Sequence, residues 1–372
     1  MIEASTPPAT RLERRDFNAL PGWNADDHGA AFRALRRSAA VLADHPPKRR
    51  GLGLDAAAVS AILARALAQP ADLTAAPAKA FFEAEFTPVE IVPESGSGFF
   101  TGYYEPIVAG SRTRSERFAA PLYRAPDDLV EFDPDAPPAG IDAPIRFARR
   151  TGDGFVPYYD RAEIEAGALS GRGLELVHLA DPVDAFFIHI QGAARIELAE
   201  GGTMRVTYAA KSGHPYTPIG RVLIEMGELG KGKATMPAIR AWLAGNPERA
   251  GAIMARNRSF IFFREASVDD PGLGPIAAAK VPLTPGRSLA VDRLLHSFHV
   301  PVFVDTRLPN GQDFRRLTVA QDTGSAIVGP ARGDIFFGSG DDAGVLAGAM
   351  AAAGRFFLLA PRGSALGGGA AR

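Results

Sequence analysis

The segment AQDTGSAIVGPARGDIFFGSG, residues 320–340, holds two aspartates, Asp322 and Asp334, among closely spaced glycines. A β-prone run, FRRLTVAQD, leads into the first aspartate, and a second run, DIFFG, begins at the other. Glycine is used where the backbone turns sharply or approaches a ligand closely. The segment therefore predicts short strands connected by tight turns, with a carboxylate at the end of each strand.

These two aspartates have two interpretations. Two carboxylates held close together push their pKa values apart, which leaves one of them protonated near neutral pH. A protonated carboxyl is what acid catalysis on a glycosidic oxygen requires. Aspartates also cap turns, and Asp-Gly loops are common, so turn capping is the more frequent outcome for this spacing alone.

Short β-prone runs continue on both sides of this segment. They include SFIFFRE, LAVDRLL, PVFVDTR and FFLLAP, with Asn310-Gly311 as a type I′ turn signal. Upstream, GFFTGYYEPIV at 98–108 is aromatic and β-prone, and AARIEL and MRVTYAA flank Glu200-Gly201-Gly202 as hairpin strands would. Short strands separated by Gly/Pro turns predict β-barrels rather than a doubly wound sheet.

The first part of the chain has helical patterning instead. Helices are expected at 27–42, at 55–68 with Asp55 as the cap, and at 78–86. Two later helices are expected at about 218–228 and from Thr235, whose apolar residues fall on one face. The residues at 127–144 are rich in Asp and Pro and predict a loop. The predicted fold class is therefore mainly β with peripheral α-helices.

Composition limits the classes of function. The 372 residues exceed one ordinary core, so two domains are expected, and a net charge of -1 gives no basic field for nucleic acid. The absence of cysteine excludes disulfides and thiolate metal sites. No stretch approaches the roughly 20 apolar residues of a membrane helix, and neither a signal-peptide core nor a lipoprotein cysteine is visible.

Two other patterns suggest a metal or a nucleotide but do not complete either site. Residues 227–233 are close to a phosphate-binding loop, but Ala234 stands where Ser or Thr would bind magnesium. His296 and His299 lie three apart without a His-Glu-x-x-His pattern or an obvious acidic partner. No metal and no cofactor is therefore expected.

Three further motifs have the composition of ligand-binding segments. They are TGYYEP at 101–106, HIQGAAR at 189–195 and KSGHPYTPIGR at 211–221. Aromatic rings can stack on the apolar faces of sugars, and polar runs through Gly-Pro turns suit binding loops. The alternatives are a packed barrel strand for the first motif and ordinary connections for the other two.

Taken in order, these motifs resemble those of the membrane-bound lytic murein transglycosylase A family, over 86–361. The matching segments are TGYYEP, FFIHIQG, GHPYTPIGR, PLTPGRSLAVDR and AQDTGSAIVGPARGD. The last one resembles the 3D domain, whose three aspartates fit Asp305, Asp322 and Asp334. The resemblance implies a double-psi β-barrel domain formed by 1–104 with 257–372. It also implies an inserted β domain at 105–256 and a groove between the two domains that holds glycan.

The resemblance implies cleavage of the β-1,4 bond between N-acetylmuramic acid and N-acetylglucosamine in peptidoglycan, with a 1,6-anhydro product formed without water. Asp334 is then the catalytic acid/base, and Asp322 either orients it or raises its pKa. The expected substrate-binding residues are Thr101, Gly102, Tyr103, Tyr104, Gln191, Gly192, His214, Tyr216, Gly324 and Ser325. This chain departs from the family pattern at Ala193-Ala194, where Ser-Gly is usual, and at Ser325, where Gly is usual.

The remaining expectations concern partners, location and rival functions. The expected partner is peptidoglycan glycan, without nucleic acid or a transmembrane helix, and the protein is expected to be a monomer. Its expected location is the cell envelope, in the periplasm, with association with the outer membrane left open. The rival functions are a hydrolytic glycosidase on the same fold and a catalytically silent peptidoglycan-binding module.

Overall fold

The computed structural model describes residues 10–364 apart from 134–137, 139–140 and 142–144, so part of the loop predicted at 127–144 lies outside the described residues. The chain forms two compact units, Met1–Tyr104 with Pro271–Arg372 (unit 1) and Glu105–Asp270 (unit 2). The sequence analysis predicted that the chain re-enters the first domain at residue 257, whereas unit 1 resumes at Pro271. Residues 257–270 belong to unit 2, because strand β12 (Ile261–Ala266) pairs with β11 (Thr203–Lys211).

Unit 1 is built on an eight-stranded sheet of described residues, in the order β1-β2-β17-β14-β15-β13-β16-β3. The strands are β1 (Thr10–Arg14), β2 (Phe86–Pro93), β3 (Gly98–Glu105), β13 (Ser288–Val291), β14 (Pro301–Arg307), β15 (Asp313–Asp322), β16 (Arg332–Ser339) and β17 (Ala351–Pro361). Strand β3 also pairs with β17, so the strands from β17 to β3 close a ring. The structure confirms a mainly β fold with helices, and the double-psi crossing stays a prediction.

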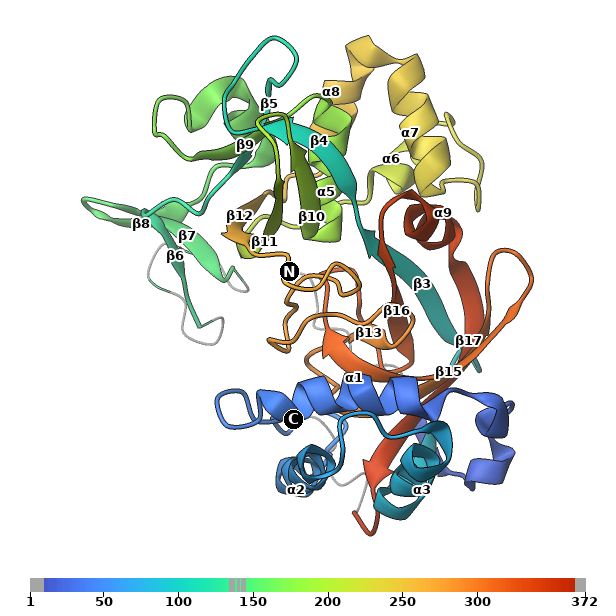
Figure 1. The fold of residues 1–372 in the computed structure, drawn as a ribbon. Coiled ribbons are helices and arrows are strands. Elements are labelled where there is room, and N and C mark those ends of the chain that lie inside the picture. The colour runs from blue at the N-terminus through green and yellow to red at the C-terminus, as the bar shows by residue number, and fades with distance from the viewer. Residues whose placement is uncertain (1–9, 134–137, 139–140, 142–144, 365–372) are drawn as a thin grey trace. The chain divides into compact units, whose positions relative to one another are not determined.

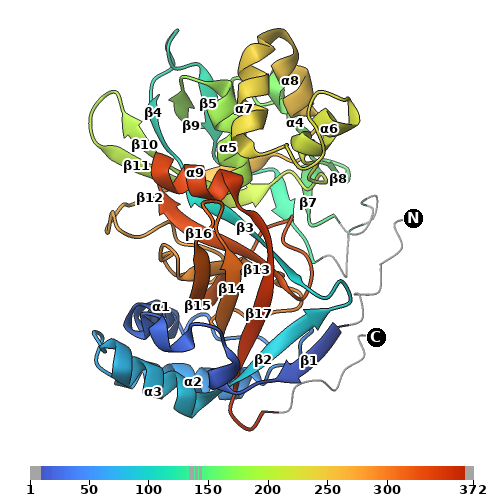
Figure 2. The ribbon, with the colours of Figure 1, turned by 90° about the vertical axis from the view of Figure 1, so that its right-hand side faces the viewer.

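Three N-terminal helices pack beside this sheet, as Figures 1 and 2 show. They are α1 (His28–Ala40), α2 (Ala56–Ala68) and α3 (Ala75–Glu85), and a fourth helix of unit 1, α9 (Asp341–Ala349), precedes β17. The side chain of Asp27 accepts a hydrogen bond from Ala30 N, and Asp55 accepts from two backbone amides at the start of α2. These caps satisfy amides that have no partner within the helix, and the predicted cap at Asp55 is confirmed.

The core of unit 1 lies between these helices and the sheet. Phe32 and Phe82 from the helices meet Phe303 and Phe357 from the strands in one buried apolar cluster. All four side chains are fully buried. Burial of each phenylalanine contributes about 1.5–3 kcal/mol to the free energy of unfolding, so this cluster fixes the strands that carry the segment at 320–340 with its two aspartates.

Unit 2 contains a six-stranded sheet of described residues in the order β12-β11-β10-β4-β9-β5, and a smaller sheet β6-β7-β8. The remaining strands are β4 (Ile107–Ser111), β5 (Ala120–Tyr123), β6 (Leu129–Glu131), β7 (Phe147–Thr151), β8 (Gly154–Pro157), β9 (Glu175–Leu179) and β10 (Ala193–Leu198). Strands β10 and β11 form the hairpin predicted around Glu200-Gly201-Gly202, with Glu197 paired to Thr203.

The helices of unit 2 lie in part where the sequence patterning predicts them. They are α4 (Arg161–Glu163), which continues as a helical turn at Ile164–Ala168, α5 (Pro182–Gln191), α6 (Ile219–Glu225), α7 (Met236–Gly245) and α8 (Pro247–Ala255). Thr235 caps α7, whose buried face is formed by Ile239, Trp242 and Leu243. Helix α5 was not predicted, although Asp181 caps it and Pro182 stands in its first turn.

A buried ion cluster lies at the beginning of unit 2. The carboxylate of Glu105 has no exposed surface and accepts hydrogen bonds from Arg195 Nε at 2.7 Å and Arg205 Nε at 2.5 Å. Both arginine side chains are less than a tenth exposed. Because the charges are shielded from water, removing the carboxylate would take away a counter-ion that two buried guanidinium groups share.

We therefore expect Glu105→Gln to lower the free energy of unfolding by about 3 kcal/mol or more, measured by urea denaturation. The matched control is Glu265→Gln, because Glu265 pairs with Arg112 through side chains that are each nearly half exposed. An exposed pair contributes about 1 kcal/mol or less. Equal losses in the two variants would contradict the importance of the buried cluster.

Candidate active site

Asp334 lies on β16 and is half-buried. Its backbone pairs with Ala290 of β13, and its Oδ1 accepts a hydrogen bond from Thr101 Oγ1 on β3. Burial raises the pKa of the Asp334 carboxyl, whereas the charge of Arg332 and the hydrogen bond from Thr101 act to lower this pKa. Removal from water is the largest effect, so the carboxyl keeps its proton to a higher pH than an ordinary aspartate.

Arg332 is a member of this cluster that the sequence analysis did not identify. Its Nη2 donates a hydrogen bond of 2.6 Å to Thr101 Oγ1, and its guanidinium lies 5.3 Å from the centre of the Phe99 ring. Residues two apart on a strand face the same side, so the Arg-Gly-Asp spacing at 332–334 was the signal that could have found it. Arg332 therefore contacts Asp334 through the hydroxyl of Thr101.

Asp322 ends β15 and has a different environment. Its Oδ2 accepts from the hydroxyl of Tyr103 at 2.9 Å, and its Oδ1 accepts from Ala278 N at 3.2 Å. Burial raises the pKa of Asp322 to about 6, and the charge of Asp334 adds a smaller contribution in the same direction. Desolvation therefore raises both carboxyl pKa values, and repulsion between the carboxylates, which the sequence suggested as the main cause, is secondary.

The two carboxyl groups differ in how many of their oxygens accept a hydrogen bond from the protein. Both oxygens of Asp322 accept hydrogen bonds from protein donors. The Oδ2 of Asp334 has no partner among the residues that the structure describes, whereas its Oδ1 is held by Thr101. Asp334 is therefore the carboxyl of this pair that can exchange a proton with a ligand.

The strand motif TGYYEP divides between two faces, because side chains alternate along a strand. Thr101 and Tyr103 face the aspartates. Gly102 approaches Phe337 and α9 so closely that a Cβ atom would lie 2.4 Å from Phe337 Cε2, and the buried ring of Tyr104 packs over Gly344. Only glycine fits at 102, so Gly102 and Tyr104 hold β3 in place while their neighbours line the site.

The other predicted residues of unit 1 lie at the edge of this cluster or outside it. Gly324 and Ser325 are exposed in the turn after Asp322. Asp305, the third aspartate of the 3D pattern, lies on β14 and pairs with Arg315 Nε at 3.1 Å. Among the described residues, Asp305 has no hydrogen bond or ion pair with the two site aspartates, so its interactions are those of a strand ion pair.

The predicted substrate-binding residues of unit 2 can be described by their surroundings within that unit, and their role stays a prediction. Gln191 ends α5, and Gly192 caps this helix with a φ of 80°, a conformation that favours glycine. His214 Nε2 contacts Tyr158 O at 2.6 Å, and Tyr216 is half-buried. Ala193 and Ala194, where the family usually has Ser-Gly, are buried in β10, and Ala194 adds to an apolar core.

Two protein-family models match the chain. The MltA specific insert domain matches residues 99–264, and the 3D domain matches residues 287–360. Within the described residues, no group of three His, Asp or Glu side chains is arranged to hold a metal ion. No helix in that part of the chain has the length and apolar character needed to cross a bilayer.

Solved structures with known names are similar over nearly the whole chain. A membrane-bound lytic murein transglycosylase from Agrobacterium tumefaciens is 43% identical, with a TM-score of 0.87, over 94% of this chain and 98% of that one. MltA from Neisseria gonorrhoeae is 33% identical, with a TM-score of 0.78, over 97% and 96%. Membrane-bound lytic murein transglycosylase A of Escherichia coli K12 is 34% identical over 71% of this chain, which spans 66% of that relative's length.

The raised pKa of Asp322 predicts a pH-dependent contribution to stability. Between about pH 4 and 6 the folded state holds a proton that the unfolded state has released, so the free energy of unfolding falls as the pH rises through this window. Asp322→Asn does not titrate. We therefore expect the variant to gain roughly 2 kcal/mol relative to the unmodified protein between pH 4 and pH 7, measured by urea unfolding. A difference that is constant with pH would contradict the shifted pKa.

Proposed function

The chain belongs to the membrane-bound lytic murein transglycosylase A family, and we propose that it cleaves the β-1,4 bond between N-acetylmuramic acid and N-acetylglucosamine in peptidoglycan. The observation that carries this proposal is the half-buried carboxyl of Asp334, which has a raised pKa and one oxygen without a protein partner. Such a group can deliver a proton to a glycosidic oxygen at a pH where an ordinary aspartate is ionised.

The hydrogen bonds determine which oxygen of Asp334 carries the proton. Thr101 Oγ1 accepts from Arg332 Nη2 and donates its single hydrogen to Asp334 Oδ1. An oxygen that accepts this hydrogen bond is not the protonated one, which leaves the acidic proton on Oδ2. The proton therefore lies on the oxygen that is open to a ligand.

The reaction proceeds from there in two proton transfers. Asp334 Oδ2 donates its proton to the glycosidic oxygen, the bond from that oxygen to C1 of the muramoyl sugar breaks, and positive charge develops at C1. The resulting carboxylate then takes the proton of the C6 hydroxyl of the same sugar. The C6 oxygen bonds to C1, which gives the 1,6-anhydro product and returns Asp334 to its acid form.

One carboxyl is sufficient because the nucleophile belongs to the substrate. An intramolecular nucleophile that is well oriented has an effective molarity on the order of 10⁵ M or more. Arg332 and Thr101 both favour the charged form of Asp334, so they stabilise the carboxylate that acts as base in the second transfer. Burial favours the acid form, and the balance of these effects suits a group that has to serve in both forms.

Asp322 has a positioning role in this proposal. Both of its oxygens are occupied, and its hydrogen bond from Tyr103 links the end of β15 to β3, the strand that also carries Thr101. Asp322 therefore helps to hold Thr101 opposite Asp334.

The rival functions are less well supported by this geometry. A hydrolase needs a second carboxyl as nucleophile or to activate water, and both oxygens of Asp322 are already bonded to protein donors. A silent binding module gives no reason for the free Oδ2 of Asp334. The names of the relatives place them at a membrane and on murein, which supports a location in the cell envelope. A periplasmic, monomeric enzyme is part of the same proposal.

Replacing Asp334 with Asn removes the titratable proton and keeps the shape of the side chain. We expect the release of soluble fragments from purified sacculi to fall by about 10²-fold or more, because general acid catalysis is lost. Mass spectrometry of the products of the unmodified protein should show anhydro-muropeptides, each lighter by one water than a hydrolysis product. Asp305→Asn is the matched control and should keep its activity. Normal rates in Asp334→Asn would exclude Asp334 as the acid.

Arg332 provides a second test through the pH profile. The acid form of Asp334 starts the reaction, so kcat/KM should fall as the pH rises through the raised pKa of this carboxyl. Because the charge of Arg332 lowers this pKa, Arg332→Gln should move the alkaline limb of the profile to higher pH, by an amount on the order of one unit. Arg332→Lys keeps the charge and should leave the limb close to its original place. A limb that does not move in Arg332→Gln would contradict this role.

A further inference from the structure

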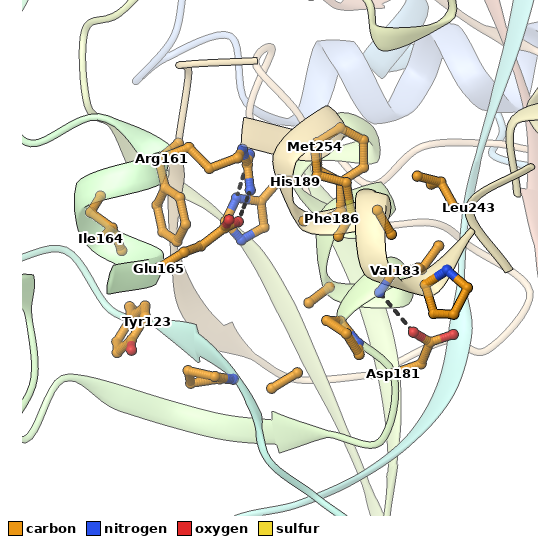
Figure 3. Close-up of a pocket in the computed structure, with 18 of the residues that line it drawn as sticks. Tyr123, Arg161, Ile164, Glu165, Asp181, Val183, Phe186, His189, Leu243 and Met254 are labelled. Atoms are coloured by element: carbon orange, nitrogen blue, oxygen red, sulfur yellow. Dashed lines mark hydrogen bonds and ion pairs between the residues drawn. The ribbon is translucent and has the colours of Figure 1, made fainter. Parts of the chain in front are cut away.

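Unit 2 contains a cavity of about 660 Å³, shown in Figure 3. All of its lining residues belong to unit 2, and most lie on β5, on the helical segment from Arg161 to Ala168, and on α5, α7 and α8. Its inner wall is apolar and is formed by Ile164, Phe186, Leu243, Met254 and Phe260, all of which are buried. The volume lies in the range of small-molecule sites, and the aspartate cluster of unit 1 takes no part in it.

Arg161 organises the polar side of this cavity. Its side chain is 2% exposed, and its Nη1 donates to Glu165 Oε1 at 3.2 Å. Its Nη2 lies 3.3 Å from His189 Nδ1, and its other hydrogen bonds go to the carbonyl oxygens of Asn257 and Ser259. The guanidinium is therefore bonded to protein on all sides, and it holds Glu165 and His189 next to the same cavity.

His189 presents a hydrogen-bond donor to the cavity. Its Nδ1 faces Arg161 Nη2 and the amide of Ile261, both of which are donors, so Nδ1 is the acceptor and the ring proton lies on Nε2. Burial lowers the pKa of His189 well below 6.5, which keeps the ring neutral. The residue is 5% exposed, and its Nε2 has no partner among the described residues. Figure 3 shows the second ring nitrogen turned away from Arg161.

Glu165 presents an acceptor beside this donor. Its Oε1 is bonded to Arg161, its Oε2 has no partner in the described part of the chain, and the side chain is 40% exposed. An anionic ligand group is disfavoured here by the carboxylate of Glu165, because the two arginines of the cavity wall are already paired, Arg161 with Glu165 and Arg240 with Asp184. An ammonium group is disfavoured by the N–H of His189. The pair therefore matches a neutral group that both accepts and donates a hydrogen bond.

We propose that this cavity is a second saccharide site that binds the 2-acetamido group of an amino sugar, an inference that rests on the proposed function. The carbonyl of the acetamido group accepts from His189 Nε2, and its N–H donates to Glu165 Oε2. The methyl group and one face of the sugar ring lie against the apolar wall, where Phe186 and Phe260 supply aromatic surface. Both sugars of peptidoglycan carry this group. The cavity would therefore bind glycan at a second place, where no bond is cleaved.

The test uses the full chain with methyl-labelled Ile, Leu and Met, and N-acetylglucosamine as the probe, because the free monosaccharide contains no bond for the enzyme to cleave. We expect saturable shifts of the methyl signals of Ile164, Leu243 and Met254. Glucose, which lacks the acetamido group, should not produce them. Equal shifts with glucose, stronger shifts with a blocked peptide amide such as N-acetylalanine amide, or no shift at these methyls would each overturn the proposal.

Two glycines provide a matched pair of variants. Gly251 lines the cavity on α8, and a Cβ atom added there would meet nothing within 4 Å, so Gly251→Leu has room for a side chain at the cavity wall. We expect this variant to weaken binding by about tenfold or more. Gly245 ends α7 with the same open space and does not line the cavity, so Gly245→Leu should bind normally. Equal binding by both variants would overturn the site.

The binding experiment and the cleavage experiment can fail separately, so their outcomes distinguish the two proposals. Asp334→Asn should lose the release of anhydro-muropeptides and keep the methyl shifts of unit 2. Shifts without any cleavage by the unmodified protein would leave a saccharide site in a chain that lacks the proposed activity. Cleavage without these shifts would leave the enzyme and remove the second site.

Discussion

The hydrogen bond from Thr101 Oγ1 to Asp334 Oδ1 is the interaction on which the rest of the account depends. Asp334 is drawn toward its acid form by removal from water and toward its charged form by Arg332 and Thr101. The hydroxyl between Arg332 and Asp334 separates these effects in space, because it bonds one carboxyl oxygen and leaves the other for a ligand. A carboxyl without this contact could rotate, and its proton would have no fixed direction.

The strand pairing of unit 1 holds Thr101 and Asp334 in contact. Thr101 lies on β3, which is far in the chain from β15 and β16, the consecutive strands that carry Asp322 and Asp334. Strand β13 pairs with both β15 and β16, and β3 closes the ring by pairing with β17. The apolar cluster of unit 1 fixes these strands from one side, and Gly102 allows β3 to come close enough to Phe337 for Thr101 to reach Asp334.

Local features of this structure could be predicted from the sequence, and non-local ones could not. The cap at Asp55, the hairpin around Glu200 and the buried face of α7 depend on residues within a few positions of one another. The strand order of the barrel and the extension of unit 2 to Asp270 depend on pairing between distant segments. The family resemblance, confirmed by the matches of both domains, supplied what local patterning lacked.

The same distinction applies to the site. Asp322 and Asp334 were candidates from their segment, and the family resemblance supplied their expected roles. The cause of their raised pKa values could not be predicted, because burial is a property of the folded chain. Arg332 was within reach of the alternation rule for strands and was missed. The pair of Glu165 and His189 could not be found in this way, since it is defined by the buried guanidinium of Arg161 and by a cavity that no single segment forms.

The central claim is that Asp334 is a proton donor because the folded chain keeps its carboxyl protonated. Its most direct measurement is a ¹³C NMR titration of the aspartate carboxyl carbons, with the Asp334 signal assigned by comparison with Asp334→Asn. The account predicts that Asp334 titrates at a distinctly higher pH than an exposed aspartate. A carboxyl that ionises at or below the ordinary value of about 3.9 would contradict it, since no acid form would then be available near neutral pH.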